Sequence, residues 1–202
     1  KGFSKAVTVG DKLQLEMKSF CLTEDAVTNC DIELLPGSYD MSDYQWTIEE
    51  NLSMTGTGYH NMGMSNGKLR VNGNARLSSG QLSLGRGQAE IVGALGLEDM
   101  QLLAYWGSLS VGGNMVLEKS TVVEMSQKVG KISVKGDYEI YATSASKYDK
   151  GDLIIGGNLT QYKEAVENSL NLSDSFNLHL NGEKRQKITL AYPDTTYLGV
   201  LN

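Results

Sequence analysis

Short runs in which apolar and polar residues alternate recur along most of the chain. The clearest example is KLRVNGNARL, residues 68–77. Two alternating pairs flank a Gly-Asn step there: Leu69 and Val71 before Gly73-Asn74, and Ala75 and Leu77 after it. Alternation with a period of two is typical of short β-strands with one buried face. The Gly-Asn step predicts a sharp corner with a left-handed backbone residue.

This pattern repeats with a nearly constant period. Its first apolar residue recurs at spacings of 23, 20, 20, 23 and 21, at Trp46, Leu69, Ala89, Leu109, Ile132 and Leu153. Weaker copies begin at Leu178 and Leu198. A second apolar position follows 13 residues after the first in three copies, at Leu82, Leu102 and Val122. Each repeat of about 21 residues is therefore expected to contain three short strands.

A repeat of this size cannot fold alone. It would bury perhaps five aliphatic side chains, worth roughly 1.5 to 3 kcal/mol each, while ordering its backbone costs about 1 to 2 kcal/mol per residue. Stacking one coil on the next removes the deficit. The sequence therefore predicts an all-β fold, a right-handed parallel β-helix with coils of 20–23 residues. Leucine-rich repeats have a similar length, but their L-x-x-L-x-L-x-x-N pattern is missing.

The lattice also predicts the domain organisation and the core. Residues 1–43 do not follow it clearly and are expected to form an N-terminal cap or a first irregular coil. Residues 44–202 are expected to form the β-helix, which we expect to continue beyond residue 202. Two inward columns are predicted, one of Leu69, Ala89 and Leu109 and one of Val71, Ile91 and Val111. Residues 162–177 lengthen one coil and are expected to form a short helix or a loop, a place where a solenoid can carry a binding surface.

Asparagine or aspartate recurs at one corner of this lattice, at Asn51, Asn74, Asn114, Asp137 and Asn158. Stacked coils would place these side chains above one another at the inter-strand spacing of roughly 4.8 Å. We expect an amide ladder that serves the turn. The alternative is a row of ligand-binding amides.

Composition and charge exclude several classes of function. The 202 residues are 40% hydrophobic, and 18 basic against 24 acidic residues give a formal charge of -6 without any basic run. A nucleic-acid partner is therefore not expected. No apolar stretch approaches the roughly 18 to 20 residues that cross a bilayer, so membrane insertion is not expected either.

Cysteine and histidine give no metal pattern. Cys21 and Cys30 could form a short-loop disulfide in an oxidising compartment or remain two thiols, and the sequence leaves both open. His60 and His179 are far from each other and lack the spacing of metal ligands. No metal or cofactor site is predicted.

Carboxylates provide the only candidates for catalysis, because some β-helices are polysaccharide lyases or hydrolases. Such enzymes need clustered carboxylates and a basic group that stabilises developing charge. The candidates are Glu98-Asp99, Glu118, Glu124, Asp149 and Asp152. Glu98 and Glu118 follow the second strand of adjacent coils and are expected to lie close together. Arg70 and Arg86 match no such column, and no nucleophile or phosphate-loop motif occurs. A solvated charged corner is the favoured interpretation, and no catalytic residue is assigned.

Exposed aromatic residues are the second possible source of binding. The candidates are Tyr59, Tyr105, Trp106, Tyr138, Tyr141, Tyr148 and Tyr162. Alternation places Tyr138 inward, whereas Tyr141 and Tyr148 are expected to face outward, where they could form platforms for sugar rings. Ordinary packing is the alternative for each of them.

Motifs near the end of the chain carry a resemblance. GGNLTQ at 156–161, SFNLHLNGEKRQKITL at 175–190 and YLGVLN at 197–202 resemble the repeats of large secreted or surface-attached β-solenoid proteins of Gram-positive anaerobic bacteria. The match covers about the last 50 residues. It implies an extracellular, multidomain protein comparable with adhesin stalks, and it supplies no catalytic residues.

These observations lead to one expected function and one alternative. We expect a non-catalytic structural or adhesive module of a bacterial extracellular or cell-surface protein. Its expected partners are glycans or a host or cell-surface protein, together with adjacent domains of its own chain. The alternative is a carbohydrate-active β-helix or a carbohydrate-binding module.

Overall fold

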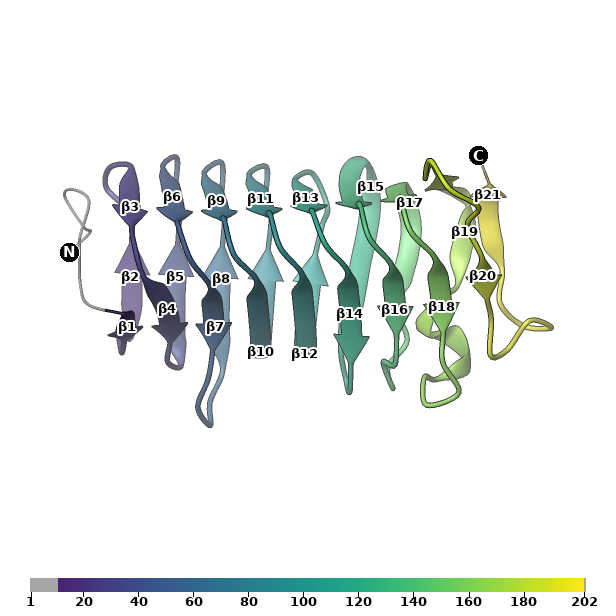
Figure 1. Ribbon diagram of the computed structural model, residues 1–202, viewed down its shortest axis with the longest axis horizontal. Coiled ribbons are helices and arrows are strands. Elements are labelled where there is room, and N and C mark those ends of the chain that lie inside the picture. The colour runs from purple at the N-terminus through teal and green to yellow at the C-terminus, as the bar shows by residue number, and fades with distance from the viewer. Residues whose placement is uncertain (1–10, 202) are drawn as a thin grey trace.

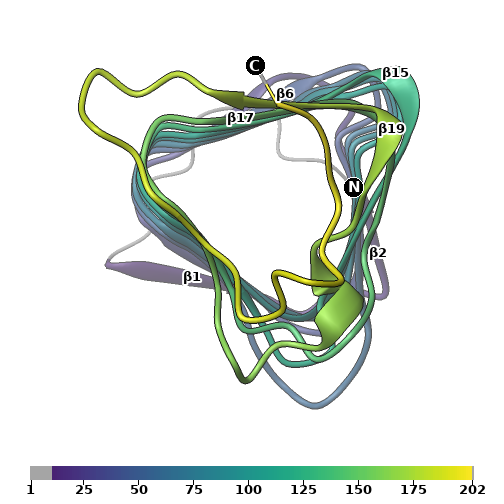
Figure 2. The same cartoon turned by 90° about the vertical axis from the view of Figure 1, so that its right-hand side faces the viewer.

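Strands of successive coils pair side by side and in parallel throughout a computed structural model of the chain, which describes residues 11–201. About nine turns of about 21 residues form an elongated solenoid (Figure 1). The strands nearest the viewer run downward and those behind run upward as the chain advances from left to right, so the helix is right-handed (Figure 1). Viewed along the axis, the coils superpose as a triangle with three flat sides (Figure 2). The predicted parallel β-helix is confirmed.

We call the three sides faces A, B and C. Face A contains β1 (Lys12–Leu15), β4 (Asp31–Leu34), β7 (Leu52–Met54), the first parts of β10 (Ala75–Ser83) and β12 (Leu95–Leu103), β14 (Met115–Glu118), β16 (Tyr138–Ile140), β18 (Leu159–Gln161) and β20 (Ile188–Thr189).

Face B contains β2 (Ser19–Cys21), β5 (Gly37–Asp40), β8 (His60–Gly63), the second parts of β10 and β12, and the first parts of β15 (Val122–Val134), β17 (Lys147–Ile155) and β19 (Leu172–Leu180). Face C contains β3 (Ala26–Thr28), β6 (Gln45–Ile48), β9 (Lys68–Val71), β11 (Gln88–Ile91), β13 (Ser108–Val111) and the second parts of β15, β17 and β19. The last strand, β21 (Leu198–Leu201), pairs with β19 on both of these faces.

The predicted inward columns are present. Leu69, Ala89 and Leu109 pair in direct register, as do Val71, Ile91 and Val111. All six side chains are at most 2% exposed. The column that contains Leu69 also continues toward the N-terminus, where Ala26 pairs with Trp46. Within residues 11–43, strands β1 to β5 pair in the same ladders as the later coils.

Two predicted positions of the lattice are wrong. Leu102 pairs with Val123 rather than Val122, because the corner from Glu118 to Val122 has one residue more than the corner from Glu98 to Gln101. A shift of one residue turns the neighbouring side chain inward. In the last copy, Leu201 rather than Leu198 pairs with Leu178, because Leu198 lies on the preceding face opposite Leu172.

The corner between faces C and A contains a ladder in which side chains support the backbone. The side-chain oxygen of Asn51 accepts a hydrogen bond from the backbone N–H of Asn74 at 2.8 Å, and Asn74 does the same for Ala94 at 2.8 Å. Asn114 and Asp137 continue the pattern farther along the axis. The predicted column is therefore present, but each amide oxygen bonds to the backbone of the next coil rather than to another amide.

Glycine precedes these residues for a reason other than the predicted one. Gly73, Gly93 and their equivalents have no left-handed backbone conformation; the non-glycine residues that do include Ser79, Asp99 and Lys119 at the corner between faces A and B. A Cβ added to Gly73 would lie 2.6 Å from the Asn51 side-chain oxygen and 2.7 Å from a backbone oxygen of Glu50. The glycine is needed because coils approach closely at the ladder.

The ladder predicts the effect of an alanine substitution. Asn74→Ala removes the acceptor of the Ala94 N–H, and loss of a side-chain acceptor of this kind costs about 1 kcal/mol. Chemical denaturation should show this loss as a lower midpoint with an unchanged slope. Asn61→Ala, at an exposed position of face B, is the matched control and should leave the midpoint unchanged. Equal midpoints for the two variants would contradict a stabilising role of the ladder.

The lengthened coil at residues 162–177 contains a single 3-10 turn, η1 (Glu167–Ser169), before β19 begins. Gln161 occupies an inward position that is apolar in the preceding coils, paired with Ile140. Its amide nitrogen donates to the backbone oxygen of Glu167 and to Ser169 Oγ, both at 3.1 Å. A buried amide therefore anchors the insertion to the core.

Candidate binding face

Face A presents two outward rows of side chains, and together these rows form the candidate site. The first row contains Ser53, Arg76, Gly96, Val116, Glu139, Thr160 and Thr189 in direct register. The second row contains Ser78, Glu98, Glu118, Tyr141 and Tyr162. Most members of the first row are small, so the face is flat between its few large side chains.

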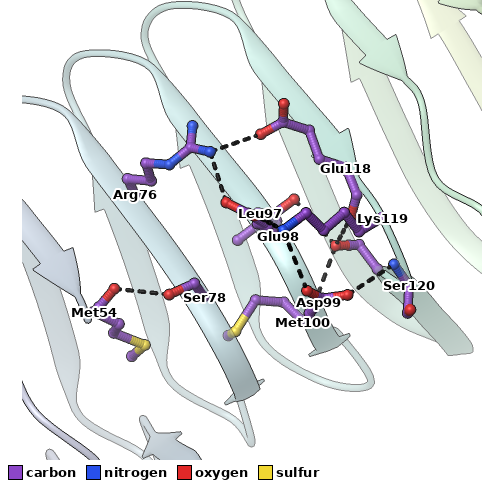
Figure 3. A network of polar contacts seen from close by, with 11 residues as sticks. Met54, Arg76, Ser78, Leu97, Glu98, Asp99, Met100, Glu118, Lys119 and Ser120 are labelled. Carbon is purple, nitrogen blue, oxygen red and sulfur yellow. Dashed lines mark hydrogen bonds and ion pairs between the residues drawn. The ribbon is translucent and has the colours of Figure 1, made fainter. Parts of the chain in front are cut away.

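Arg76 connects three coils through its guanidinium (Figure 3). Its Nη2 donates to Glu98 at 2.7 Å and to Glu118 at 3.1 Å. Lys119 forms an ion pair with the other oxygen of Glu98 and lies 3.9 Å from Asp99. Glu98 and Glu118 are in direct register, so the prediction that they lie close together is confirmed.

Gly96 makes this reach possible. It lies between Arg76 and Val116 in the outward row and has no side chain to block the guanidinium. A Cβ at this position would have Arg76 Nη1 as its nearest neighbour, at 3.6 Å. The sequence analysis does not identify Arg76 as a partner of these carboxylates, because it considers only Arg70 and Arg86. The signal that could have revealed it is the 20-residue step from Arg76 to Gly96, beside the step from Glu98 to Glu118.

The cations keep Glu98 ionised. Hydrogen bonds from Lys119 and then Arg76 lower the pKa of Glu98 below its ordinary value, although burial opposes them. Glu98 correspondingly raises the pKa of Arg76 and of Lys119. A general acid needs the opposite shift, since it must be protonated near the working pH.

This shift predicts a pH-dependent effect of Glu98→Gln. A carboxyl whose pKa is lowered by folding stabilises the protein above its unfolded pKa of about 4.3, and that contribution disappears as the pH falls through the folded pKa. Because Arg76 and Lys119 are well exposed, the substitution should cost no more than about 1 kcal/mol at pH 7. Denaturation midpoints of the two proteins should converge below about pH 4. A difference that grows with acidity would contradict this assignment.

A shallow depression of about 420 Å³ lies beside Arg76, where face A meets the corner ladder. Its floor is low because Ala94 and Gly96 replace the larger residues found in neighbouring coils. Asn51, Asn74 and Glu118 contribute to its rim. Polar groups therefore surround a small apolar floor.

Two tyrosines continue the second outward row toward the C-terminal end. The rings of Tyr141 and Tyr162 are stacked, with centroids 4.0 Å apart and planes inclined by 10°. Both hydroxyls donate to one oxygen of Glu139, at 3.4 and 3.3 Å. The hydroxyl of Tyr162, burial and Glu139 raise the pKa of Tyr141. Both rings are partly exposed, in agreement with the expectation for Tyr141.

The other aromatic candidates are distributed differently. Tyr138 is buried, as expected, but Tyr148 is buried too, and the expectation that it faces outward is wrong. The two hydroxyls meet inside the core at 2.9 Å, because each tyrosine satisfies the other's polar atom there. Tyr59 and Trp106 are 61% and 50% exposed.

The remaining carboxylate candidates lie outside the two outward rows of face A. Glu124 accepts hydrogen bonds from Gln101 and Tyr105 on face B. Asp152 Oδ1 accepts a hydrogen bond from Asn177 Nδ2 at 2.8 Å and lies 3.5 Å from His179 Nε2. Asp149 lies elsewhere, in a depression that includes Asp174 and Tyr197.

Cysteine and histidine are also placed apart. Cys21 is exposed and lies 2.9 Å from Ser42 Oγ, whereas Cys30 is buried, and the two are not bonded to each other. The ring of His60 is buried against backbone oxygens of Leu34 and Thr55, at 3.2 and 3.1 Å. Within residues 11–201, no three His, Cys, Asp or Glu side chains gather as a metal site. In the same part of the chain, no helix has the length and apolar character required to span a membrane.

Comparisons with known proteins add no relative to this description. The chain matches no family model, no curated protein and no solved structure.

Proposed function

We propose that this chain is a non-catalytic structural module with an adhesive surface, displayed outside a bacterial cell. The observation that carries the proposal is the uninterrupted stacking of side chains through the coils, from Ala26 to Leu178 in a single inward column. Such a solenoid is stabilised by contacts between neighbouring coils and holds its outer faces at fixed spacing. The resemblance of residues 156–161, 175–190 and 197–202 to surface β-solenoids supports the extracellular location.

The charges on face A favour this function over hydrolysis. Glu98 and Glu118 stand on adjacent coils, a separation that could suit a pair of glycosidase carboxyls. Cations contact both oxygens of Glu98, however, and lower its pKa. A retaining or inverting glycosidase requires one carboxyl with a raised pKa. Glu98 is therefore unsuited to be the acid of such a pair, and it forms ion pairs with Arg76 and Lys119.

A degradation assay tests the non-catalytic part of the proposal. The purified chain is incubated with a panel of neutral and acidic polysaccharides, and new reducing ends and unsaturated products are measured. No product is expected. Turnover that disappears in Glu98→Gln or Glu118→Gln would overturn the proposal and establish the carbohydrate-active alternative.

Surface labelling tests the location. Antibodies against the chain should label intact producing cells, and external protease should remove the signal without lysis. Labelling that requires permeabilised cells would contradict an extracellular role, whatever the outcome of the degradation assay.

A further inference from the structure

We infer that the strip on face A from Arg76 to Tyr162 binds a neutral polysaccharide whose chain lies along the solenoid axis. This inference rests on the proposed adhesive function and names its ligand. The strip is the second outward row together with Arg76, the depression at Gly96, and Glu139. Five successive coils contribute to it.

The strip retains hydrogen-bonding capacity. Arg76 uses only Nη2 in its contacts with Glu98 and Glu118 among residues 11–201, so Nε and Nη1 remain available as donors. Glu118 contacts Arg76 through one oxygen, and in the same part of the chain its other oxygen has no partner. Sugar hydroxyls both donate and accept, so one ring can satisfy such a donor and such an acceptor at the same time.

The strip also offers apolar surface beside the stacked rings of Tyr141 and Tyr162, each of which covers one face of the other. The stacked Tyr141 and Tyr162 are held by Glu139 and lose little conformational freedom on binding. Aromatic rings that combine an apolar body with a polar end are well suited to partly wet interfaces. The depression at Gly96 adds an apolar floor two coils away from Tyr141.

Charge selects a neutral ligand. The strip and its immediate neighbour Lys119 contain three carboxylates, Glu98, Glu118 and Glu139, against two cations, and the chain as a whole carries -6. An acidic polysaccharide would be repelled, whereas a neutral one loses only water from the strip. Glu98 and Glu118 occupy the same position in adjacent coils, as do Tyr141 and Tyr162, so a ligand with a regular repeat can contact neighbouring coils in one orientation.

Titration of the folded chain with neutral oligosaccharides tests the inference. Hexamers of β-1,4-linked glucose and of N-acetylglucosamine serve as neutral probes, and a polygalacturonate oligomer of the same length serves as the acidic probe. Calorimetry measures affinity, and backbone amide shifts in NMR spectra locate the site. At least one neutral hexamer should bind and shift amides of β12, β14 and β16, and the acidic oligomer should bind at least ten-fold more weakly.

Three variants separate the strip from other surfaces. Gly96→Leu fills the depression and places a side chain against the Arg76 guanidinium, and Tyr141→Ala removes a ring, so each should weaken binding by ten-fold or more. Tyr59→Ala removes a more exposed ring outside the strip and should leave affinity unchanged. Thermal unfolding of all three variants verifies that the solenoid is intact, and Gly96→Leu carries the test if Tyr141→Ala is unfolded.

Several outcomes would overturn the inference. These are absence of binding to either neutral hexamer, tighter binding of the acidic oligomer, shifts confined to faces B and C, and unchanged affinity in Gly96→Leu. Each leaves the proposed structural function standing, provided that the same oligosaccharides are recovered uncleaved. Cleavage of a bound hexamer would instead contradict the proposed function itself.

Discussion

Replacing Val111 by aspartate should abolish the cooperative unfolding transition of the solenoid. Val111 is fully buried in an inward column, in direct register with Ile91 and Val134. A lone carboxylate in such an apolar column lacks any partner and costs several kcal/mol. That is a large share of the 5–15 kcal/mol typical of a folded domain. Circular dichroism during heating should show either no transition or a transition shifted far downward.

The matched control places the same substitution on the outside. Val92 follows Ile91 directly in the chain and is 44% exposed. Val92→Asp should therefore shift the melting temperature by no more than a few degrees, because surface substitutions usually stay within about 0.5 kcal/mol. Comparable loss of the transition in both variants, or its retention in Val111→Asp, would contradict the inward assignment of this column.

Gly73→Ala should lower the melting temperature by about 2 to 12 °C. The added methyl would meet the Asn51 side-chain oxygen at 2.6 Å and the Glu50 backbone oxygen at 2.7 Å. Overpacking of this kind costs about 1 to 3 kcal/mol. Each kcal/mol corresponds to about 2 to 4 °C in a chain of this length. Differential scanning calorimetry measures the change directly.

Gly96→Ala supplies the comparison at an open position. Its added methyl would have no neighbour nearer than 3.6 Å. Replacing glycine where the backbone tolerates alanine restricts the unfolded chain and stabilises by about 0.4 to 1 kcal/mol. The melting temperature should therefore stay the same or rise slightly. A similar decrease in Gly73→Ala and Gly96→Ala would contradict the assignment of the effect to the close approach of coils at Gly73.

Sequence-based prediction fails in this chain at one corner, in the last copy and at Tyr148. Val122 and Val123 are both apolar, so alternation alone does not identify which of them faces inward. The extra corner residue before them decides this, and Thr121 then takes a buried position with hydrogen bonds to backbone oxygens of Leu97 and Glu118. The orientation of Tyr148 likewise does not follow from the sequence, because its burial depends on the hydroxyl of Tyr138 in another strand.

The sequence by itself determined the repeat, the parallel solenoid and the inward columns. These depend on a period of about 21 residues and a strand alternation of two, and both are readable because every coil must present the same apolar positions to its neighbours. Only the tertiary structure decided which carboxylates Arg76 contacts, which tyrosines stack, and why position 73 requires glycine. Those features depend on contacts between side chains of different coils, and such contacts follow from the register of each corner and from the space left by residues such as Gly96.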